Sequence, residues 1–173
     1  MRKQKGFTLV EMLVVIAIIA ILAGAVLLAI NPIATMRKSR DTTRLSDLDS
    51  LRSAINIALT EGEIILTNMA TPETSVSSGQ AVDGLTGYVR FDIPGFGTPQ
   101  AKTGLGRYIP ALPLDPTNDA TLDIPLVYTF QSTADNFEIN AVLEYEDNAV
   151  KMTTDGGDND DVYEVGTSLT IIN

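Results

Sequence analysis

Residues 5–11 read KGFTLVE, and residues 12–30 continue directly with MLVVIAIIAILAGAVLLAI. This second run contains no charged side chain and none more polar than glycine. As a helix that rises about 1.5 Å per residue, it matches a hydrocarbon core roughly 30 Å thick. The sequence therefore predicts a helix that enters a membrane.

Glu11 is the anomaly, because it places a carboxylate at the start of this apolar run. An acidic residue within a membrane helix costs about 2.5–3.5 kcal/mol on insertion scales. Two interpretations remain open from its position alone. Glu11 either has a function in contacts with another molecule, or it extends its side chain to the polar edge of the membrane.

These residues resemble the N-terminus of the type IV pilin and type II secretion pseudopilin family. In that family a membrane peptidase, the prepilin peptidase, removes a short basic leader that ends in glycine, and the mature chain begins Phe-Thr-Leu-x-Glu. The resemblance implies a leader at residues 1–6, cleavage between Gly6 and Phe7, and methylation of the new Phe7 amine. It also implies that Glu11 meets the amine of a neighbouring subunit during assembly. The motif covers only about the first thirty residues.

Physics agrees with that role for Glu11. Opposite charges attract far more strongly in a medium of low dielectric constant than in water. A carboxylate that is otherwise expensive would then select one axial register between subunits.

A secretory signal peptide is the competing interpretation of the same stretch. Arg2, Lys3 and Lys5 form a basic start, and residues 23–25 offer the small side chains of a cleavage site. The apolar region of such a peptide is usually 7–15 residues long, however, and this run continues to Ile30. The cations at residues 37–44 rival those of the leader, so the placement of the leader in the cytoplasm rests on the resemblance.

Composition narrows the chemistry. The chain of 173 residues has a formal net charge of −10 and contains neither Cys nor His. It can therefore form no disulfide, no Cys or His nucleophile–base pair and no zinc site of the usual ligand types. From Tyr108 onward Lys151 is the only cation, so the acidic C-terminal part is not expected to bind nucleic acid directly.

Residues 34–61 predict an amphipathic helix that ends at Gly62. Its charged side chains, among them the i,i+3 pair Asp41 and Arg44, are expected on the solvent face, where such a pair adds a few tenths of a kcal/mol. Before this helix, Pro32 predicts one of two arrangements. The chain either bends within one long helix or ends a first helix and begins a second one.

Two stretches alternate apolar and polar side chains, residues 126–131 and residues 137–146. Alternation is typical of strands with one buried face, and the residues between them predict an antiparallel hairpin. Glu144 and Glu146 would then share an exposed polar face of the second strand. Residues 88–93 also alternate and predict a shorter strand.

Residues 108–116 read YIPALPLDP and are similar to a segment of major secretion pseudopilins in which a Pro-x-Asp-Pro turn leads into the sheet. In such a turn Asp115 can accept hydrogen bonds from nearby backbone N–H groups. The tryptophan that usually follows in those proteins is missing here, where Thr117 and Asn118 stand instead.

The expected fold class is α+β, the pilin fold: a long N-terminal helix whose first half spans the membrane and whose second half packs on a small antiparallel β-sheet. The expected parts are a cleaved leader at 1–6, a transmembrane or filament-core helix at 7–31, an amphipathic helix at 32–62, a variable loop region at 63–107, and an antiparallel sheet with an acidic C-terminal loop at 108–173.

Residues 155–161 read DGGDNDD, which gathers carboxylates on a stretch that two glycines allow to turn tightly. Hard oxygen ligands on a flexible loop suit Ca²⁺, although the spacing is not that of an EF-hand. A solvated acidic turn is the alternative. Pseudopilins that resemble this chain bind calcium on such a loop, which implies a structural ion. Its expected ligands are Asp155, Asp158, Asp160 and Asp161.

The resemblance implies a structural subunit and not an enzyme: a single-pass protein of the inner or cytoplasmic membrane, with its head outside the cytoplasm, that polymerises into an extracellular or periplasmic filament. The filament would be a type IV pilus or a type II secretion-like pseudopilus. The implied partners are copies of itself, homologous pilins, the prepilin peptidase, an assembly platform with its motor, and membrane lipid. The alternative is a membrane-anchored binding module that never polymerises.

Overall fold

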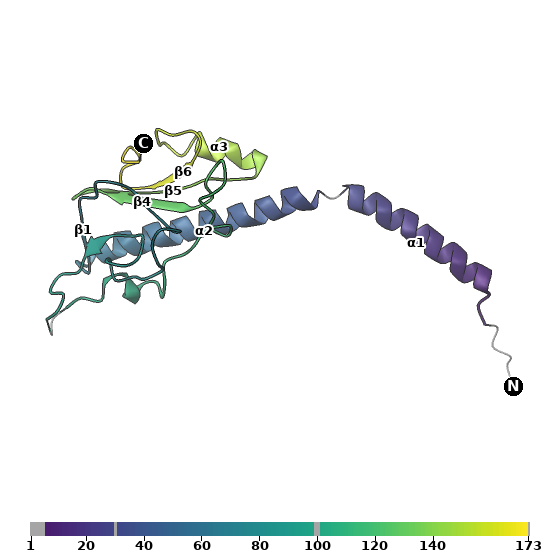
Figure 1. Cartoon of the computed structure of the whole chain (residues 1–173), viewed down its shortest axis with the longest axis horizontal. Coiled ribbons are helices and arrows are strands. Elements are labelled where there is room, and N and C mark those ends of the chain that lie inside the picture. The colour runs from purple at the N-terminus through teal and green to yellow at the C-terminus, as the bar shows by residue number, and fades with distance from the viewer. Residues whose placement is uncertain (1–5, 30, 99–100, 173) are drawn as a thin grey trace. The chain divides into compact units, whose positions relative to one another are not determined.

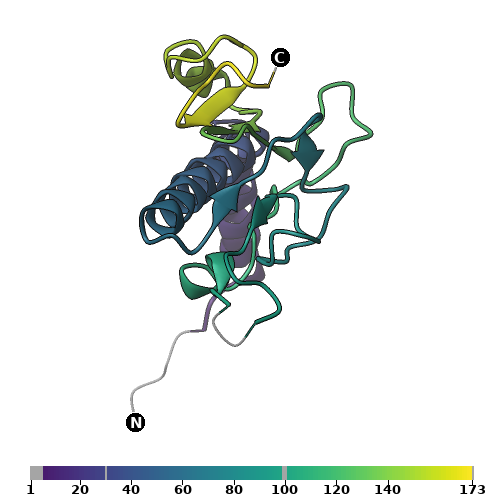
Figure 2. The same ribbon diagram turned by 90° about the vertical axis from the view of Figure 1, so that its left-hand side faces the viewer.

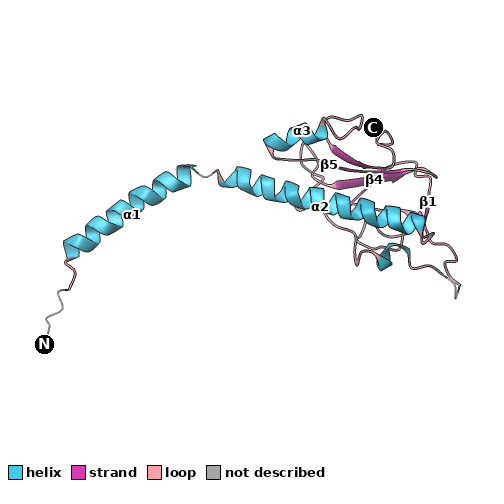
Figure 3. Ribbon diagram, turned by 180° about the vertical axis from the view of Figure 1, so that it is seen from behind, coloured by secondary structure: helices cyan, strands magenta, loops and turns pink. Residues whose placement is uncertain are grey.

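The structure is a computed structural model that describes residues 6–29, 31–98 and 101–172. The chain divides into two compact units, residues 1–36 and residues 37–173, which we describe one at a time. Figure 1 labels the helices and strands, and Figure 3 colours them by type.

The first unit contains helix α1, Leu9–Ala29. Residues 9–26 of this helix are long enough and apolar enough to cross a membrane, and none of them is buried within the chain. The apolar helix that the sequence predicts is therefore confirmed, with its start at Leu9. The long helix α2, Pro32–Thr60, begins three residues after α1 ends.

The start of α2 follows from local chemistry. The amide of Ala34 donates to the side-chain oxygen of Asn31 at 3.2 Å, which makes Asn31 the N-cap of the helix. Pro32 then occupies the first helical position, where its missing N–H costs nothing. The described residues thus place the start of a capped helix at Pro32, as in the second of the two arrangements, and Ile30 lies outside the described residues.

The second unit packs α2 against two antiparallel sheets. The order of the four-stranded sheet is β2-β4-β5-β6, and the two-stranded sheet pairs β1 with β3. Their bounds are β1 Ile65–Leu66, β2 Glu73–Thr74, β3 Phe91–Asp92, β4 Tyr128–Ser132, β5 Phe137–Ala141 and β6 Tyr163–Gly166. Short helices complete the unit at η1 Gly104–Arg107, η2 Glu146–Asn148 and α3 Ala149–Met152. In Figure 2 strands β5 and β6 lie over one side of α2.

The core lies between α2 and the sheets. Leu48, Leu51 and Ile55 from the helix are fully buried, as are the aromatic side chains of Phe130 and Phe137 on β4 and β5. These two rings stack with their centroids 6.3 Å apart. The helix ends at Thr60, and Gly62 adopts a positive φ of 64°, the conformation in which glycine stops a helix. The predicted α+β class is therefore confirmed.

The predicted hairpin exists, but its second strand is shorter than expected. Strand β5 stops at Ala141, and residues 142–145 leave the sheet. The expectation of a shared exposed face for Glu144 and Glu146 is therefore wrong. Only Glu146 is exposed, whereas Glu144 turns toward α2. Strands β1, β2 and β6 have no counterpart among the predicted strands, because they are two to four residues long.

A buried cluster of charges fastens α2 to the C-terminal half of the chain. The guanidinium of Arg44, fully buried, donates from Nε and Nη2 to the two carboxylate oxygens of Asp115 at 2.6 and 2.9 Å. Its Nη1 donates to Asp41 at 2.9 Å and to Glu144 at 2.7 Å. Arg40 adds a two-pronged contact to Glu144 at 2.7 and 2.8 Å. We call these five residues the Arg44 cluster.

The carboxylates of this cluster also organise the backbone around them. Asp41 accepts hydrogen bonds from the amides of Glu144 and Tyr145, both at 2.9 Å. Asp115 accepts from the amides of Thr117 at 2.7 Å and Asn118 at 3.2 Å, as expected for its turn. The expectation that Asp41 and Arg44 form a weak surface pair is wrong, because both side chains are fully buried.

Hydrogen bonds within the cluster shift the pKa values of Arg44 and Glu144. Burial alone would lower the pKa of Arg44, but its hydrogen bonds to Asp115, Glu144 and Asp41 raise that pKa above its ordinary value. The hydrogen bond from Arg40, together with Arg44 and against the effect of burial, lowers the pKa of Glu144 from 4.5 to about 2. Arg44 and Glu144 are therefore charged at neutral pH, and each depends on its partners for compensation.

Removal of Arg44 should be costly. We expect Arg44→Ala to lower the free energy of unfolding by about 3–5 kcal/mol, because it leaves buried carboxylates without a counter-charge. Arg52→Ala is the matched control, since Arg52 also pairs with an aspartate three residues away on α2 but in solvent. Its effect should stay within about 0.5 kcal/mol. Urea unfolding of the full chain in detergent micelles measures both, and equal losses would contradict the role given to the Arg44 cluster.

Acid should weaken the cluster through Glu144. Its pKa is lowered by folding, so its contribution is complete above the unfolded value of 4.5 and is lost as the pH falls toward about 2. We expect the urea midpoint of the wild type to fall over this window, and that of Glu144→Gln to fall less steeply. The difference between the two pH profiles isolates Glu144 from the other carboxylates. Parallel profiles would refute the assignment.

Candidate assembly site on the N-terminal helix

The predicted cleavage site lies in an accessible segment ahead of α1. Residues 1–5 of the predicted leader lie outside the described part of the chain, whereas Gly6 and Phe7 are described and exposed, Phe7 to 82 %. A side chain built on Gly6 would meet no atom within 4 Å. The described residues of this chain therefore make no demand for glycine at position 6. Any such demand comes from another molecule.

Glu11 forms a capping box with Thr8. The Thr8 amide and hydroxyl both donate to Glu11 Oε2 at 2.9 Å, and the Glu11 amide donates to the Thr8 hydroxyl at 3.2 Å. In this reciprocal arrangement the N-cap and the third helical residue satisfy backbone donors that the first turn leaves free. The T-x-x-E signature at residues 8–11 is a signal in the sequence from which this cap could have been predicted.

The capping box gives Glu11 a local reason to stand where it does. A carboxylate near a helix N-terminus is favoured by the helix dipole and by the free amides of the first turn. Both hydrogen bonds that the described residues give to the carboxylate end on Oε2. The structure places Glu11 exposed and close to Phe7 in sequence, and its predicted contact with a second subunit stays a prediction.

Helix α1 exposes its apolar side chains on all sides. The exposure of its large apolar residues ranges from 47 % at Val15 to 81 % at Leu9. Small residues at Ala17, Ala20, Ala23 and Gly24 interrupt this surface, and a side chain added at Gly24 would meet nothing within 4 Å. A helix that is apolar all round must be covered by lipid or by protein. Small side chains allow other helices to approach it closely.

The acidic loop at residues 155–161 is not gathered around a common point. Asp155 accepts hydrogen bonds from the amides of Gly157 at 3.0 Å and Glu164 at 2.8 Å, whereas Asp158, Asp160 and Asp161 are exposed. Within residues 6–29, 31–98 and 101–172, no three Asp, Glu, His or Cys side chains lie close enough to hold a metal ion. The predicted calcium site on these four aspartates stays a prediction.

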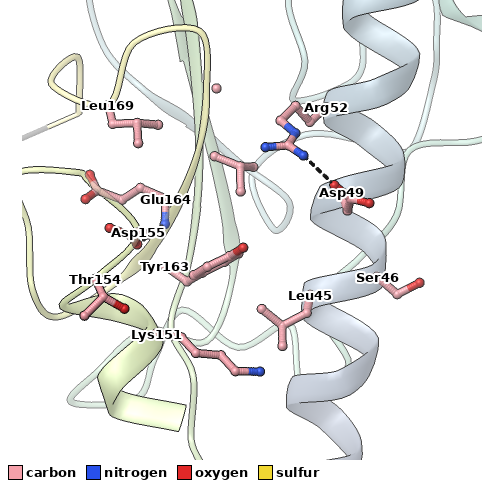
Figure 4. A pocket seen from close by; sticks show the side chains of 12 residues that line it. Leu45, Ser46, Asp49, Arg52, Lys151, Thr154, Asp155, Tyr163, Glu164 and Leu169 are labelled. Atoms are coloured by element: carbon pink, nitrogen blue, oxygen red, sulfur yellow. Dashed lines mark hydrogen bonds and ion pairs between the residues drawn. The ribbon is translucent and has the colours of Figure 1, made fainter.

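A hollow of about 630 Å³ separates α2 from the edge strand β6 (Figure 4). Leu45 on the helix and Tyr163 on the strand lie on its two sides, with the exposed Asp49–Arg52 pair and Lys151 around them. Its lining combines apolar and charged side chains without a convergent set of catalytic groups.

The fold and the N-terminal segment define a class: an α+β protein whose head packs on a long helix, preceded by an apolar helix that must be covered by lipid or protein. A family model described as the prokaryotic N-terminal methylation motif matches residues 1–27. No solved structure matches the chain.

Three relatives match the chain over about half of its length. Fimbrial protein Q of Moraxella bovis is 37 % identical over 86 residues, which cover 50 % of this chain and 54 % of that protein. The type IV major alpha-pilin of Moraxella bovis is 40 % identical over 77 residues, or 44 % and 45 % of the two chains. A fimbrial protein of Pseudomonas aeruginosa is 35 % identical over 80 residues, or 46 % and 50 %.

The motif and these relatives together support the type IV pilin family for this chain. The chain spans about half the length of the curated relatives that it matches. The relatives are structural pilins, so a role that is not enzymatic fits this family. Residues 9–26 of α1 are long enough and apolar enough to cross a membrane.

Proposed function

We propose that this protein is a structural subunit of a type IV pilus that is stored in the membrane through α1 and then polymerised through the same helix. The observation that carries the proposal is the exposure of α1, whose apolar surface has no cover within its own chain. Lipid covers it before assembly, and the α1 helices of other copies cover it afterwards.

Replacing lipid by protein around α1 changes the hydrophobic free energy little, because lipid tails are as apolar as leucine. Close packing and polar contacts must therefore decide how the helices associate. The small residues of α1 allow this close packing. The work of extraction comes from the assembly platform and its motor, which the resemblance implies as partners.

Glu11 provides the polar contact in this proposal. The prepilin peptidase cuts between Gly6 and Phe7 and leaves an amine at Phe7, which is then methylated. In the filament this amine lies against Glu11 of a neighbouring copy, where the low dielectric constant strengthens the attraction. The capping box supports this role, because it holds the Glu11 carboxylate at the helix start through Oε2.

A type II secretion-like pseudopilus remains the closest variant of this proposal, and the similarity to a fimbrial protein and a type IV pilin favours the pilus. The alternative function is an anchored binding module that does not polymerise. The capping box favours it in one respect, since it accounts for Thr8 and Glu11 at the helix start within a single chain and without any partner. In both cases the head lies outside the cytoplasm.

Two substitutions separate the charge of Glu11 from its capping role. Glu11→Gln keeps a side chain that can complete a capping box but removes the charge, whereas Thr8→Val removes the capping hydroxyl and keeps the charge. We expect Glu11→Gln to abolish filaments and Thr8→Val to retain them at a cost of about 1 kcal/mol in helix stability. Electron microscopy of cells with an antibody against the head reads the result.

The opposite pattern, filaments with Glu11→Gln and none with Thr8→Val, would show that only the cap matters. Immunoblots of the membrane fraction must show equal amounts of both variants. Absence of filaments from wild-type cells that contain the processed protein would favour the anchored module.

The leader assignment has its own test at Gly6. We expect Gly6→Leu to accumulate as a precursor that retains residues 1–6, while the fold is unchanged because the position is free of contacts. Gly24→Leu is the matched control, since it makes the same change at another open position and should be processed normally. Intact mass spectrometry of protein from its own cells distinguishes the forms. Normal maturation of Gly6→Leu would count against the cleavage site.

A further inference from the structure

Three buried polar side chains lie together on the face of the sheet that is turned away from α2. Glu138 and Asn140 alternate on β5, and Glu164 on β6 is the direct partner of Asn140 in the strand register. Their exposures are 0 %, 4 % and 2 %. Figure 4 shows the Glu164 side chain directed away from α2, whereas Tyr163 lies on the helix side.

Each of these side chains has one oxygen without a hydrogen-bond partner. They are Glu138 Oε1, Asn140 Oδ1 and Glu164 Oε1, and among the described residues no other buried side-chain nitrogen or oxygen is in this state. The second oxygen of each carboxylate is occupied. Glu138 Oε2 accepts from the amides of Ile171 at 2.6 Å and Ile172 at 3.2 Å, and Glu164 Oε2 accepts from Asn159 at 3.3 Å.

The two carboxyl groups also lack a counter-charge. They lie on the adjacent strands β5 and β6, and the ion pairs of the described residues include neither of them. Burial, followed by the neighbouring Glu138, raises the pKa of Glu164 to about 7. Buried charges without compensation are strongly unfavourable, and buried acceptors are almost always satisfied.

The acidic loop lies directly over this pair. The Glu164 amide donates to Asp155 at 2.8 Å, which ties the start of the loop to β6. A side chain at Gly157 would overlap the Glu164 carboxylate in its present position, so the loop backbone lies directly against that carboxylate. The loop therefore covers Glu164, whereas Asp158, Asp160 and Asp161 on the same loop are exposed.

We propose that Glu138, Asn140 and Glu164 form a calcium site on the sheet, beneath the acidic loop. The three atoms without a hydrogen-bond partner are all oxygens, which are the ligand atoms that a hard cation prefers. Calcium accepts six to eight oxygens in flexible geometry, so water can complete its shell, whereas magnesium demands near-ideal octahedral geometry. The ion supplies the missing positive charge. The ligands of the cation are then residues of β5 and β6, and the acidic loop only covers the site. Because the site involves neither α1 nor Glu11, this inference does not depend on the proposed pilus function.

Calcium binding by the full chain in detergent micelles, after removal of metal and addition of CaCl₂, tests the site by titration calorimetry. We expect one ion per chain, and a loss of affinity of about tenfold or more in Glu138→Gln and Glu164→Gln. The exposed Glu146→Gln provides the matched control and should bind as the wild type does. A combined Asp158→Asn, Asp160→Asn and Asp161→Asn variant should retain binding.

Thermal unfolding supplies a second readout that does not depend on affinity. In EDTA the two Gln variants should melt above the wild type, because an amide can donate to the remaining carboxylate and removes the repulsion. In excess calcium the order should reverse. The reversal distinguishes an ion from a shared proton, which would leave the order unchanged.

Three results would overturn the proposal. One is a wild-type chain that binds no calcium, which would mean that a proton joins the two carboxyl groups. Another is loss of binding in the loop variant with retention in both Gln variants, which would return the ion to the aspartates. The third is a melting order that calcium does not change.

Discussion

The buried guanidinium of Arg44 is the interaction on which the head depends. It joins α2 to the turn at Asp115 and to the segment after β5, which are otherwise separate in the chain. A lone buried charge would be prohibitive, but five groups that share hydrogen bonds compensate one another. Such a network tolerates little displacement, so it sets the position of the helix relative to the sheet more strictly than apolar packing alone.

The two halves of the helical part meet opposite demands. The second half buries Leu48, Leu51 and Ile55 within the chain, whereas the first half exposes apolar side chains on every side. In the proposed function, storage in the membrane and assembly into a filament both require an exposed apolar helix such as α1. Lipid covers this helix in the first case, and other copies of the chain cover it in the second. The head must fold without that cover. The separately capped start of α2 at Asn31 suits this division, since it lets α2 begin without α1.

The face of the four-stranded sheet that is turned away from α2 buries polar side chains. Glu138 and Glu164 hold the C-terminal residues and the acidic loop through backbone amides, a task that a disulfide performs in many small extracellular domains. Without cysteine the chain uses carboxylates instead, and their unsatisfied oxygens create the demand for a bound cation. Stability of the C-terminal segment and cation binding are then two aspects of one arrangement.

The sequence by itself determined the apolar helix, the N-terminal methylation motif, the stop at Gly62, the hairpin and the α+β class, because each depends mainly on neighbours within a few residues. It also contained the capping box at Thr8 and Glu11. Tertiary structure alone decided the rest. Arg44 meets partners 71 and 100 residues away, and Glu138 meets the C-terminal amides across 33 and 34 residues. Local periodicity placed Asp41 and Arg44 on a solvent face, because burial of a charge depends on compensating groups that only the folded chain brings together.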